Sequence, residues 1–127
     1  MAANLTPMTF AAFLSDIQEP GTTLISPARF AQRLDLEQHY LATLAHVHRN
    51  TIGRAPRSPR LQLFLREALR VIAAATDLRG EGNQALFWFR NQPLADFGYK
   101  TPEVLVSEGR ANDVIRYVES LEAGSAG

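Results

Sequence analysis

The apolar residues of this chain recur at helical spacing along almost its whole length. The clearest run predicts a long helix from Arg60 into region 73–78, with apolar positions every three or four residues at Leu61, Phe64, Leu65, Ala68, Leu69 and Ile72. Weaker runs predict helices over 9–17, 27–34, 37–45, 48–54, 83–91, 102–108 and 111–123. Alternating apolar and polar residues, which are typical of strands, are scarce, so helices dominate the predicted structure.

Residues typical of helix ends divide these runs. Ser26-Pro27 and Thr101-Pro102 each place a capping hydroxyl before a proline at the first helical position. Gly80 and Gly82 are the predicted end of the long helix, and Gly124 is the predicted stop of the last helix. We therefore expect an all-α fold, a compact bundle of roughly six to eight helices with a helix-turn-helix in its front half. The expected segments are an N-terminal segment 1–25, a DNA-binding helix-turn-helix region 26–79 and a C-terminal domain 80–127.

The composition is that of a folded protein without disulfides. The chain has 127 residues, of which 46% are hydrophobic and 20% are charged, and it has no cysteine. No apolar run approaches the roughly 18 residues of a membrane span. The first residues lack the basic region that precedes the apolar stretch of a signal peptide. We therefore expect a cytoplasmic protein that does not enter the membrane.

The formal net charge of +0 conceals an uneven distribution. Between positions 29 and 70 eight arginines accompany three carboxylates, which leaves +5, whereas from position 71 onward five cations accompany eight carboxylates, which leaves −3. A basic middle and an acidic end indicate two different roles in one chain. Chance clustering of solvated charge is the alternative interpretation.

The stretch 41–54 has the residue pattern of a helix-turn-helix. Ala42 is small enough for two helices to approach closely, a turn falls near Ala45-His46, and Val47 and Ile52 are apolar positions that face inward. The first residues of the second helix then reach base edges, where arginine pairs with guanine and asparagine with adenine. The DNA-binding candidates are His48, Arg49, Asn50 and Thr51 for bases, and Arg54, Arg57 and Arg60 for phosphates.

An ordinary helical hairpin with a solvated arginine face is the other interpretation of this stretch. His46 stands where many such turns have glycine, and histidine adopts a left-handed conformation more readily than most residues, though at some cost. Gly53 and Pro56 also make the recognition helix short. We therefore expect DNA binding to need a dimer or a larger assembly.

A second ordered set of residues follows in the back half. A helix containing Trp88 precedes Asn91-Gln92-Pro93-Leu94, Gly98, Thr101-Pro102 with Leu105, Gly109, and a last helix with Val114 and Leu121. Together with 49–54 and the helix over 60–71, this set resembles the Xre/MbcA/ParS-type antitoxins over about 26–124. The same residue types also serve core packing, turns and caps, so the pattern identifies a fold more directly than a binding surface.

The resemblance implies the antitoxin of a type II toxin–antitoxin system, with 80–127 as its toxin-binding domain. It implies a RES-domain partner toxin that consumes NAD+ and whose active site the antitoxin blocks. It also implies a homodimer that represses its own operon as the toxin–antitoxin complex. We select the toxin-binding candidates by their position near the chain's end and by the acidic charge of this region, which is complementary to a basic pyrophosphate pocket. These candidates are Tyr99, Lys100, Glu103, Arg110, Asp113, Arg116, Tyr117, Ser120, Glu122, Gly124 and Gly127.

The sequence indicates neither an enzyme nor a metal site. His39, His46 and His48 lie close together without further ligands, and no glycine-rich phosphate loop or nucleophile motif occurs. We therefore expect no catalysis and no cofactor. Two other functions stay open, namely a stand-alone dimeric DNA-binding repressor and an interaction scaffold with no role at DNA.

Overall fold

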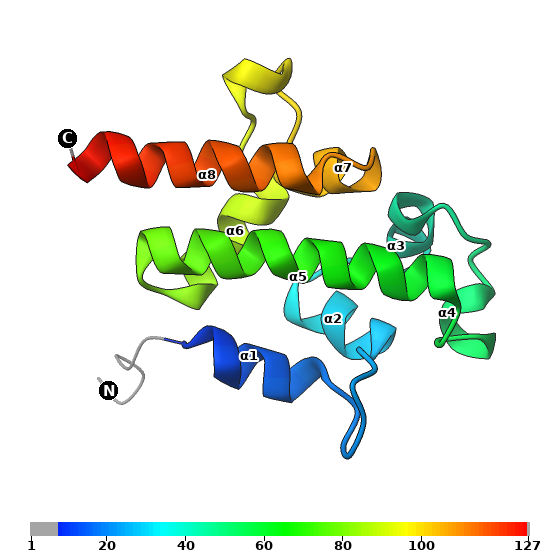
Figure 1. Ribbon diagram of the computed structural model, residues 1–127. Coiled ribbons are helices and arrows are strands. Elements are labelled where there is room, and N and C mark those ends of the chain that lie inside the picture. Colours follow the sequence, from blue (N-terminus) through cyan, green and yellow to red (C-terminus); the bar gives the residue numbers. More distant parts are fainter. Residues whose placement is uncertain (1–7, 127) are drawn as a thin grey trace.

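The structure, a computed structural model, describes residues 8–126, with side chains as far as 124. Within these residues the chain forms eight α-helices and no sheet (Figure 1), which confirms the predicted all-α class. The elements are α1 (Phe10–Ile17), α2 (Pro27–Arg33), α3 (Gln38–Ala45), α4 (Thr51–Arg54), α5 (Pro59–Arg79), α6 (Gly82–Asn91), the 3-10 helix η2 (Ala95–Phe97), α7 (Pro102–Ser107) and α8 (Ala111–Ala126).

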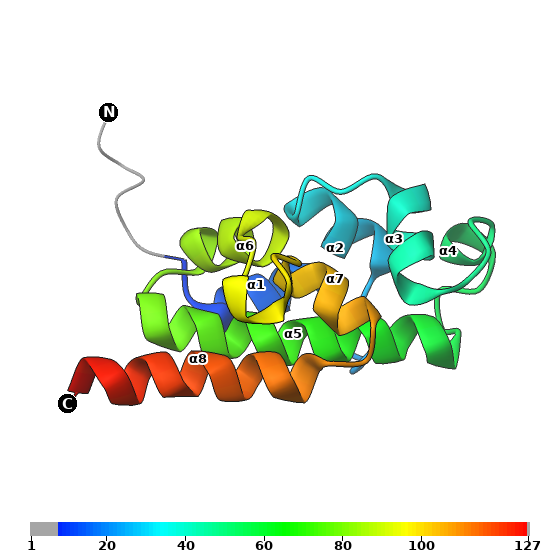
Figure 2. The ribbon, with the colours of Figure 1, turned by 90° about the horizontal axis from the view of Figure 1, so that it is seen from above.

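The long helix α5 is the centre of the fold. α8 runs alongside it in both views (Figures 1 and 2), and α2, α3, α6 and α7 also pack against it. All six apolar positions predicted for this helix are buried, and Val71, Ala75, Thr76 and Gln62 widen the buried face. A helix that contacts neighbours on several sides needs such a broad apolar face, and α5 therefore serves as a common support for both halves of the chain.

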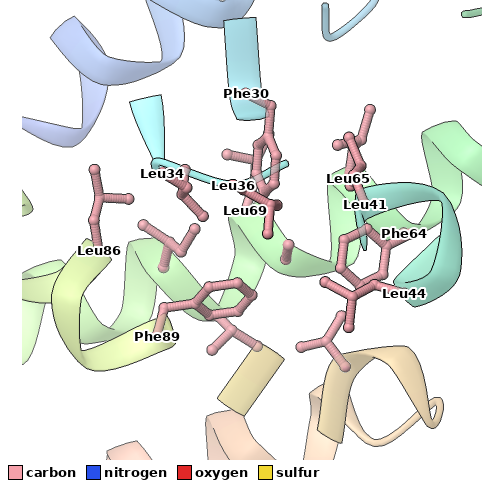
Figure 3. Packing of buried hydrophobic residues seen from close by; sticks show 14 of the residues in the cluster. Phe30, Leu34, Leu36, Leu41, Leu44, Phe64, Leu65, Leu69, Leu86 and Phe89 are labelled. Carbon is pink, nitrogen blue, oxygen red and sulfur yellow. The ribbon is translucent and has the colours of Figure 1, made fainter. Parts of the chain in front are cut away.

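One hydrophobic core joins the three predicted segments. Phe13 from the first segment, Phe30 and Leu65 from the second, and Phe89 and Val114 from the third belong to a single buried cluster. Figure 3 shows Phe30, Leu65 and Phe89 gathered around this core from α2, α5 and α6. The boundaries at 25/26 and 79/80 thus do not separate independent cores, and the division of roles between the segments stays a prediction.

The helix ends follow the predicted capping residues at three places. The Ser26 hydroxyl accepts a hydrogen bond from the Arg29 N–H at 3.2 Å, and the Thr101 hydroxyl accepts one from the Val104 N–H at 3.4 Å. Gly80 ends α5 with a φ of 73°, in the left-handed region that glycine adopts without strain. These caps explain why α2, α5 and α7 begin or end where the sequence indicates.

Two predicted boundaries are wrong. The short helix begins at Thr51 rather than at His48, because the His48 Nδ1 atom accepts a hydrogen bond from the Asn50 N–H at 3.0 Å and so stabilises a turn there. The last helix does not stop at Gly124 but continues to Ala126. Gly124 lacks the positive φ of a helix-ending glycine, so it is an interior residue of α8.

None of the described helices combines the length and the apolar character that crossing a membrane requires.

Candidate nucleic-acid and partner-binding surfaces

The segment from α3 to α4 has the local geometry of a tight helix–turn–helix. α3 ends at His46, which adopts the left-handed conformation with φ 59° and ψ 41°, and the next N–H, of Val47, donates to the Ala42 carbonyl at 3.0 Å. Ala42 and Ile52 are buried, as their small and apolar side chains predict. The left-handed turn therefore lies at the predicted position, with histidine in the place where glycine is common.

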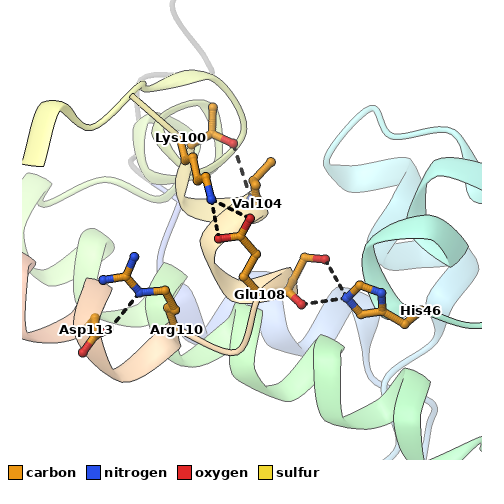
Figure 4. A network of polar contacts seen from close by, with 8 residues as sticks. His46, Lys100, Val104, Glu108, Arg110 and Asp113 are labelled. Carbon is orange, nitrogen blue, oxygen red and sulfur yellow. Dashed lines mark hydrogen bonds and ion pairs between the residues drawn. The ribbon is translucent and has the colours of Figure 1, made fainter. Parts of the chain in front are cut away.

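The His46 side chain connects this turn to the back half of the chain. Its Nε2 atom lies 2.8 Å from the Ser107 carbonyl oxygen and 3.2 Å from the Ser107 hydroxyl oxygen at the end of α7. A carbonyl oxygen only accepts, so Nε2 carries the proton and donates. The Ser107 hydroxyl in turn donates to the Leu44 carbonyl at 2.6 Å. Figure 4 shows the His46 ring facing the end of α7.

The structure brings all the DNA-binding candidates to one end of the molecule. They occupy the turn before α4, α4 itself, the turn after it and the first turn of α5, at the end far from the C-terminal end of α8 (Figures 1 and 2). Thr51 is half-buried and the others are exposed, namely His48, Arg49, Asn50, Arg54, Arg57 and Arg60. The structure thus places these candidates near one another, and their binding to DNA stays a prediction.

Buried Gln62 fixes the backbone next to this surface. Its amide nitrogen donates to the carbonyls of Ile25 at 2.8 Å and Pro56 at 2.9 Å, and its amide oxygen accepts from the Ile25 N–H at 3.2 Å. These bonds attach both the loop before α2 and the turn between α4 and α5 to the body of α5. Arg57, which directly follows Pro56, therefore extends from a backbone that the interior holds in place.

The cations of the described chain fall into two groups by their partners. Every cation of the back half has a carboxylate or an aromatic ring beside it: Arg90 with Glu103, Lys100 with Glu108, Arg110 and Arg116 with Asp113, and Arg79 with Trp88. Within residues 8–126, six arginines of the front half have no carboxylate partner, namely Arg29, Arg49, Arg54, Arg57, Arg60 and Arg66. The positive charge of the front half is thus largely available to a partner.

Several toxin-binding candidates form one cluster where the η2 loop meets the start of α8. The Arg110 guanidinium lies 5.0 Å from the centre of the Phe97 ring, which meets the Tyr117 ring edge to face at 5.8 Å. Arg110 and Arg116 both donate to Asp113. The hydrogen bond from Arg110, followed by the Arg116 contact, holds the pKa of Asp113 below its ordinary value. Asp113 therefore stays ionised here, with its charge compensated by two arginines.

The remaining candidates lie to either side of this cluster. Lys100 pairs with Glu108 at 2.8 Å (Figure 4), and Tyr99 is 71% exposed beside it. Ser120, Glu122 and Gly124 lie farther along α8, toward its C-terminal end, and are exposed. Gly127 lies outside the described residues. The structure therefore brings part of the predicted set together and spreads the rest along α8.

Glu103 is the candidate that the structure removes from the surface. It is only 3% exposed, and the Arg90 Nε atom donates to its carboxylate at 2.8 Å. Burial raises the pKa of Glu103 above its ordinary value, against the opposing hydrogen bonds from Arg90 and Tyr40. Burial, together with the neighbouring Glu103 charge, also raises the pKa of Tyr40. A partner at the surface does not meet this carboxylate, so the structure corrects the prediction that Glu103 belongs to the toxin-binding residues.

Arg90 extends the same interaction to the end of α2. Its Nη1 atom donates to the carbonyls of Leu34 at 3.1 Å and Asp35 at 2.8 Å, where the chain turns with a positive φ at Asp35. Glu103, Arg90 and Tyr40 thus connect α7, α6 and α3. Their role is to join the two halves of the protein rather than to contact a partner.

The sequence interpretation named Glu122 for the acidic surface of α8 but missed Glu119 beside it. Because Glu108 and Asp113 are paired with cations, they contribute little net charge to a partner. Glu119 and Glu122 are exposed, and neither has an ion pair within the described part of the chain. Glu119 was not among the candidates, although its spacing of three residues from Glu122 places both on one helical face.

No protein-family model, curated protein or solved structure matches this chain. Among the described residues, no three side chains of the metal-ligating types lie close enough to bind a metal ion together.

Proposed function

We propose that this protein is the antitoxin of a type II toxin–antitoxin pair, which binds and sterically blocks a RES-domain toxin that consumes NAD+. The ordered residue set of the back half supports this assignment, since its members have fitting structural roles. Trp88 is buried, Thr101 caps α7, and Gly98 and Gly109 form turns with φ of 68° and 82°. The helix–turn–helix geometry of α3 and α4 supports a second role, repression of the antitoxin's own operon, with a homodimer as the assembling unit.

The distribution of unpaired charge is the observation that carries this proposal. Four of the six arginines without carboxylate partners lie at the α4 end, whereas Glu119 and Glu122, two carboxylates without ion pairs, lie on the C-terminal half of α8, at the opposite end (Figures 1 and 2). A polyanion such as DNA complements the first surface. A cationic surface, such as a pocket for the pyrophosphate of NAD+, complements the second.

Neutralisation in this proposal is steric and partly electrostatic. α8 enters or covers the mouth of the toxin's pocket with its carboxylate face, and the exposed loop with Tyr99 enlarges the covered area. Carboxylates opposite a cationic pocket favour this orientation over others and speed association. The antitoxin needs no cofactor for this role, because it prevents NAD+ from entering rather than reacting with it.

The proposal expects a RES-domain gene beside the gene of this chain, and co-expression of the two proteins in bacteria tests it. The wild-type chain should restore growth that the toxin alone arrests. The double variant Glu119→Gln/Glu122→Gln should protect less, with the affinity for purified toxin reduced about tenfold or more, which corresponds to roughly 1.4 kcal/mol. Pull-down and growth curves measure both effects.

Asp77→Asn is the matched control, because Asp77 is an exposed carboxylate on α5 without an ion pair within the described residues. It should protect as the wild type does. Full protection by the Glu119/Glu122 double variant would reject the carboxylate face of α8 as the toxin-binding surface. Failure of the wild-type chain to protect against the neighbouring RES-domain protein would reject the antitoxin assignment itself.

A stand-alone dimeric repressor is the second candidate function. The six unpaired arginines of the front half favour it, because they are available to DNA without any partner protein. A gel shift with the chain alone separates the two candidates. Tight and sequence-specific binding without toxin supports the stand-alone repressor, whereas weak binding that strengthens with toxin supports the antitoxin.

A further inference from the structure

The four arginines at the α4 end form the basic end of the molecule: Arg49, Arg54, Arg57 and Arg60. We infer that this basic end binds the phosphate backbone of duplex DNA and reads no bases, so that operator choice arises only when several copies or a partner assemble. The inference rests on the proposed function's assignment of the α3–α4 region to DNA. It departs from the sequence interpretation, in which His48 to Thr51 contact base edges.

The charge around the basic end is almost entirely positive. No Asp or Glu occurs between positions 38 and 66, which include α3, α4 and the first part of α5. None of the four arginines has a carboxylate partner in the described structure, and Arg60 donates from Nη1 to the His46 carbonyl at 3.3 Å. An unpaired cation loses little when it binds a phosphate, because no internal ion pair has to break first.

The shape of the same region is poorly suited to reading bases. α4 has four residues and is therefore about 6 Å long, so it offers few side chains to the base edges of a major groove. Ile52 points into the core and Gly53 has no side chain, so only Thr51 and Arg54 of α4 remain to face outward. The His48 ring is engaged with the Asn50 N–H of its own turn.

Four phosphate contacts predict a definite salt dependence. The logarithm of the binding constant falls with the logarithm of salt concentration with a slope of about −0.9 per neutralised phosphate, so four contacts give about −3.6. Such binding is weak and similar for all sequences at physiological salt. Linking two or more basic ends in one assembly multiplies these weak contacts and restores tight binding where the geometry of the DNA permits.

Fluorescence anisotropy of the full chain with labelled duplexes of about 20 base pairs, over a series of NaCl concentrations, tests this inference. One duplex has the sequence upstream of the chain's own gene and the other is a scrambled version of equal composition. We expect equal affinities within about twofold and a slope near −3.6. Arg54→Gln and Arg57→Gln should each reduce the magnitude of the slope by about 0.9, and Asn50→Ala should change nothing.

Arg66→Gln is the matched control, since it removes the same charge from an exposed, unpaired arginine outside the basic end. Its slope should equal that of the wild type. A slope unchanged by Arg54→Gln and Arg57→Gln overturns the inference, as does absence of binding at low salt. A tenfold preference of the chain alone for its own upstream sequence, lost in Asn50→Ala, overturns it in favour of base reading. Protection against the toxin in the co-expression assay is a separate measurement, so failure here leaves the antitoxin assignment standing.

Discussion

At the scale of single residues, Glu103 shows how a surface candidate becomes part of the interior. Its carboxylate accepts from Arg90 at 2.8 Å, and Arg90 also donates to two carbonyls at the end of α2. Glu103→Ala leaves Arg90 without its carboxylate and opens space beside α7. We expect it to lower the free energy of unfolding by about 2–3 kcal/mol, measured by urea denaturation. Glu108→Ala, which breaks the exposed pair with Lys100, should cost less than about 1 kcal/mol; equal losses in the two variants would contradict this account of Glu103.

At the scale of elements, α8 continues past its predicted stop, and substitution of Gly124 distinguishes the predicted helix end from the observed helix interior. Gly124 lies inside α8, and a Cβ added to it would have no other atom within 4 Å. Alanine therefore fits at this position, and it favours the helix more than glycine does. Gly124→Ala should therefore raise the free energy of unfolding by about 0.5 kcal/mol. Gly80→Ala should lower it by about 1 kcal/mol, because Gly80 has a φ of 73°. Thermal unfolding followed by circular dichroism measures both. A loss of stability in Gly124→Ala would instead place a helix-ending turn there.

The elements also show which parts of the structure a sequence can predict. Spacing and caps are local, so α2, α5 and α7 begin or end where Ser26, Gly80 and Thr101 indicate. The contacts that define the surfaces are not local. His46 and Ser107 are 61 residues apart, and the Arg90–Glu103 pair depends on how α6 and α7 pack. Nothing in periodicity reports which charged side chains are paired, and pairing decides which of them a partner can meet.

At the scale of the whole molecule, the basic end and the carboxylate face of α8 lie at opposite ends of one body built on α5 (Figures 1 and 2). Substitutions at separated surfaces act independently unless a shared contact couples them. Arg54→Gln/Arg57→Gln should therefore abolish most DNA binding and leave protection against the toxin intact. Glu119→Gln/Glu122→Gln should do the reverse, as co-expression growth and anisotropy measure.

The same separation predicts that toxin and DNA bind together. A toxin on the C-terminal half of α8 leaves the α4 end accessible, so the complex should bind a duplex at least as tightly as the free chain, with a steeper salt slope if it unites several basic ends. Mass photometry should then detect one species that contains antitoxin, toxin and DNA. In the proposed complex, the His46–Ser107 hydrogen bond at 2.8 Å is the contact through which we expect a toxin near α7 to alter the α3–α4 turn. Displacement of DNA by toxin would contradict this prediction and would mean that toxin binding weakens DNA binding through the His46–Ser107 contact. His46→Ala, which removes that contact, should then restore simultaneous binding.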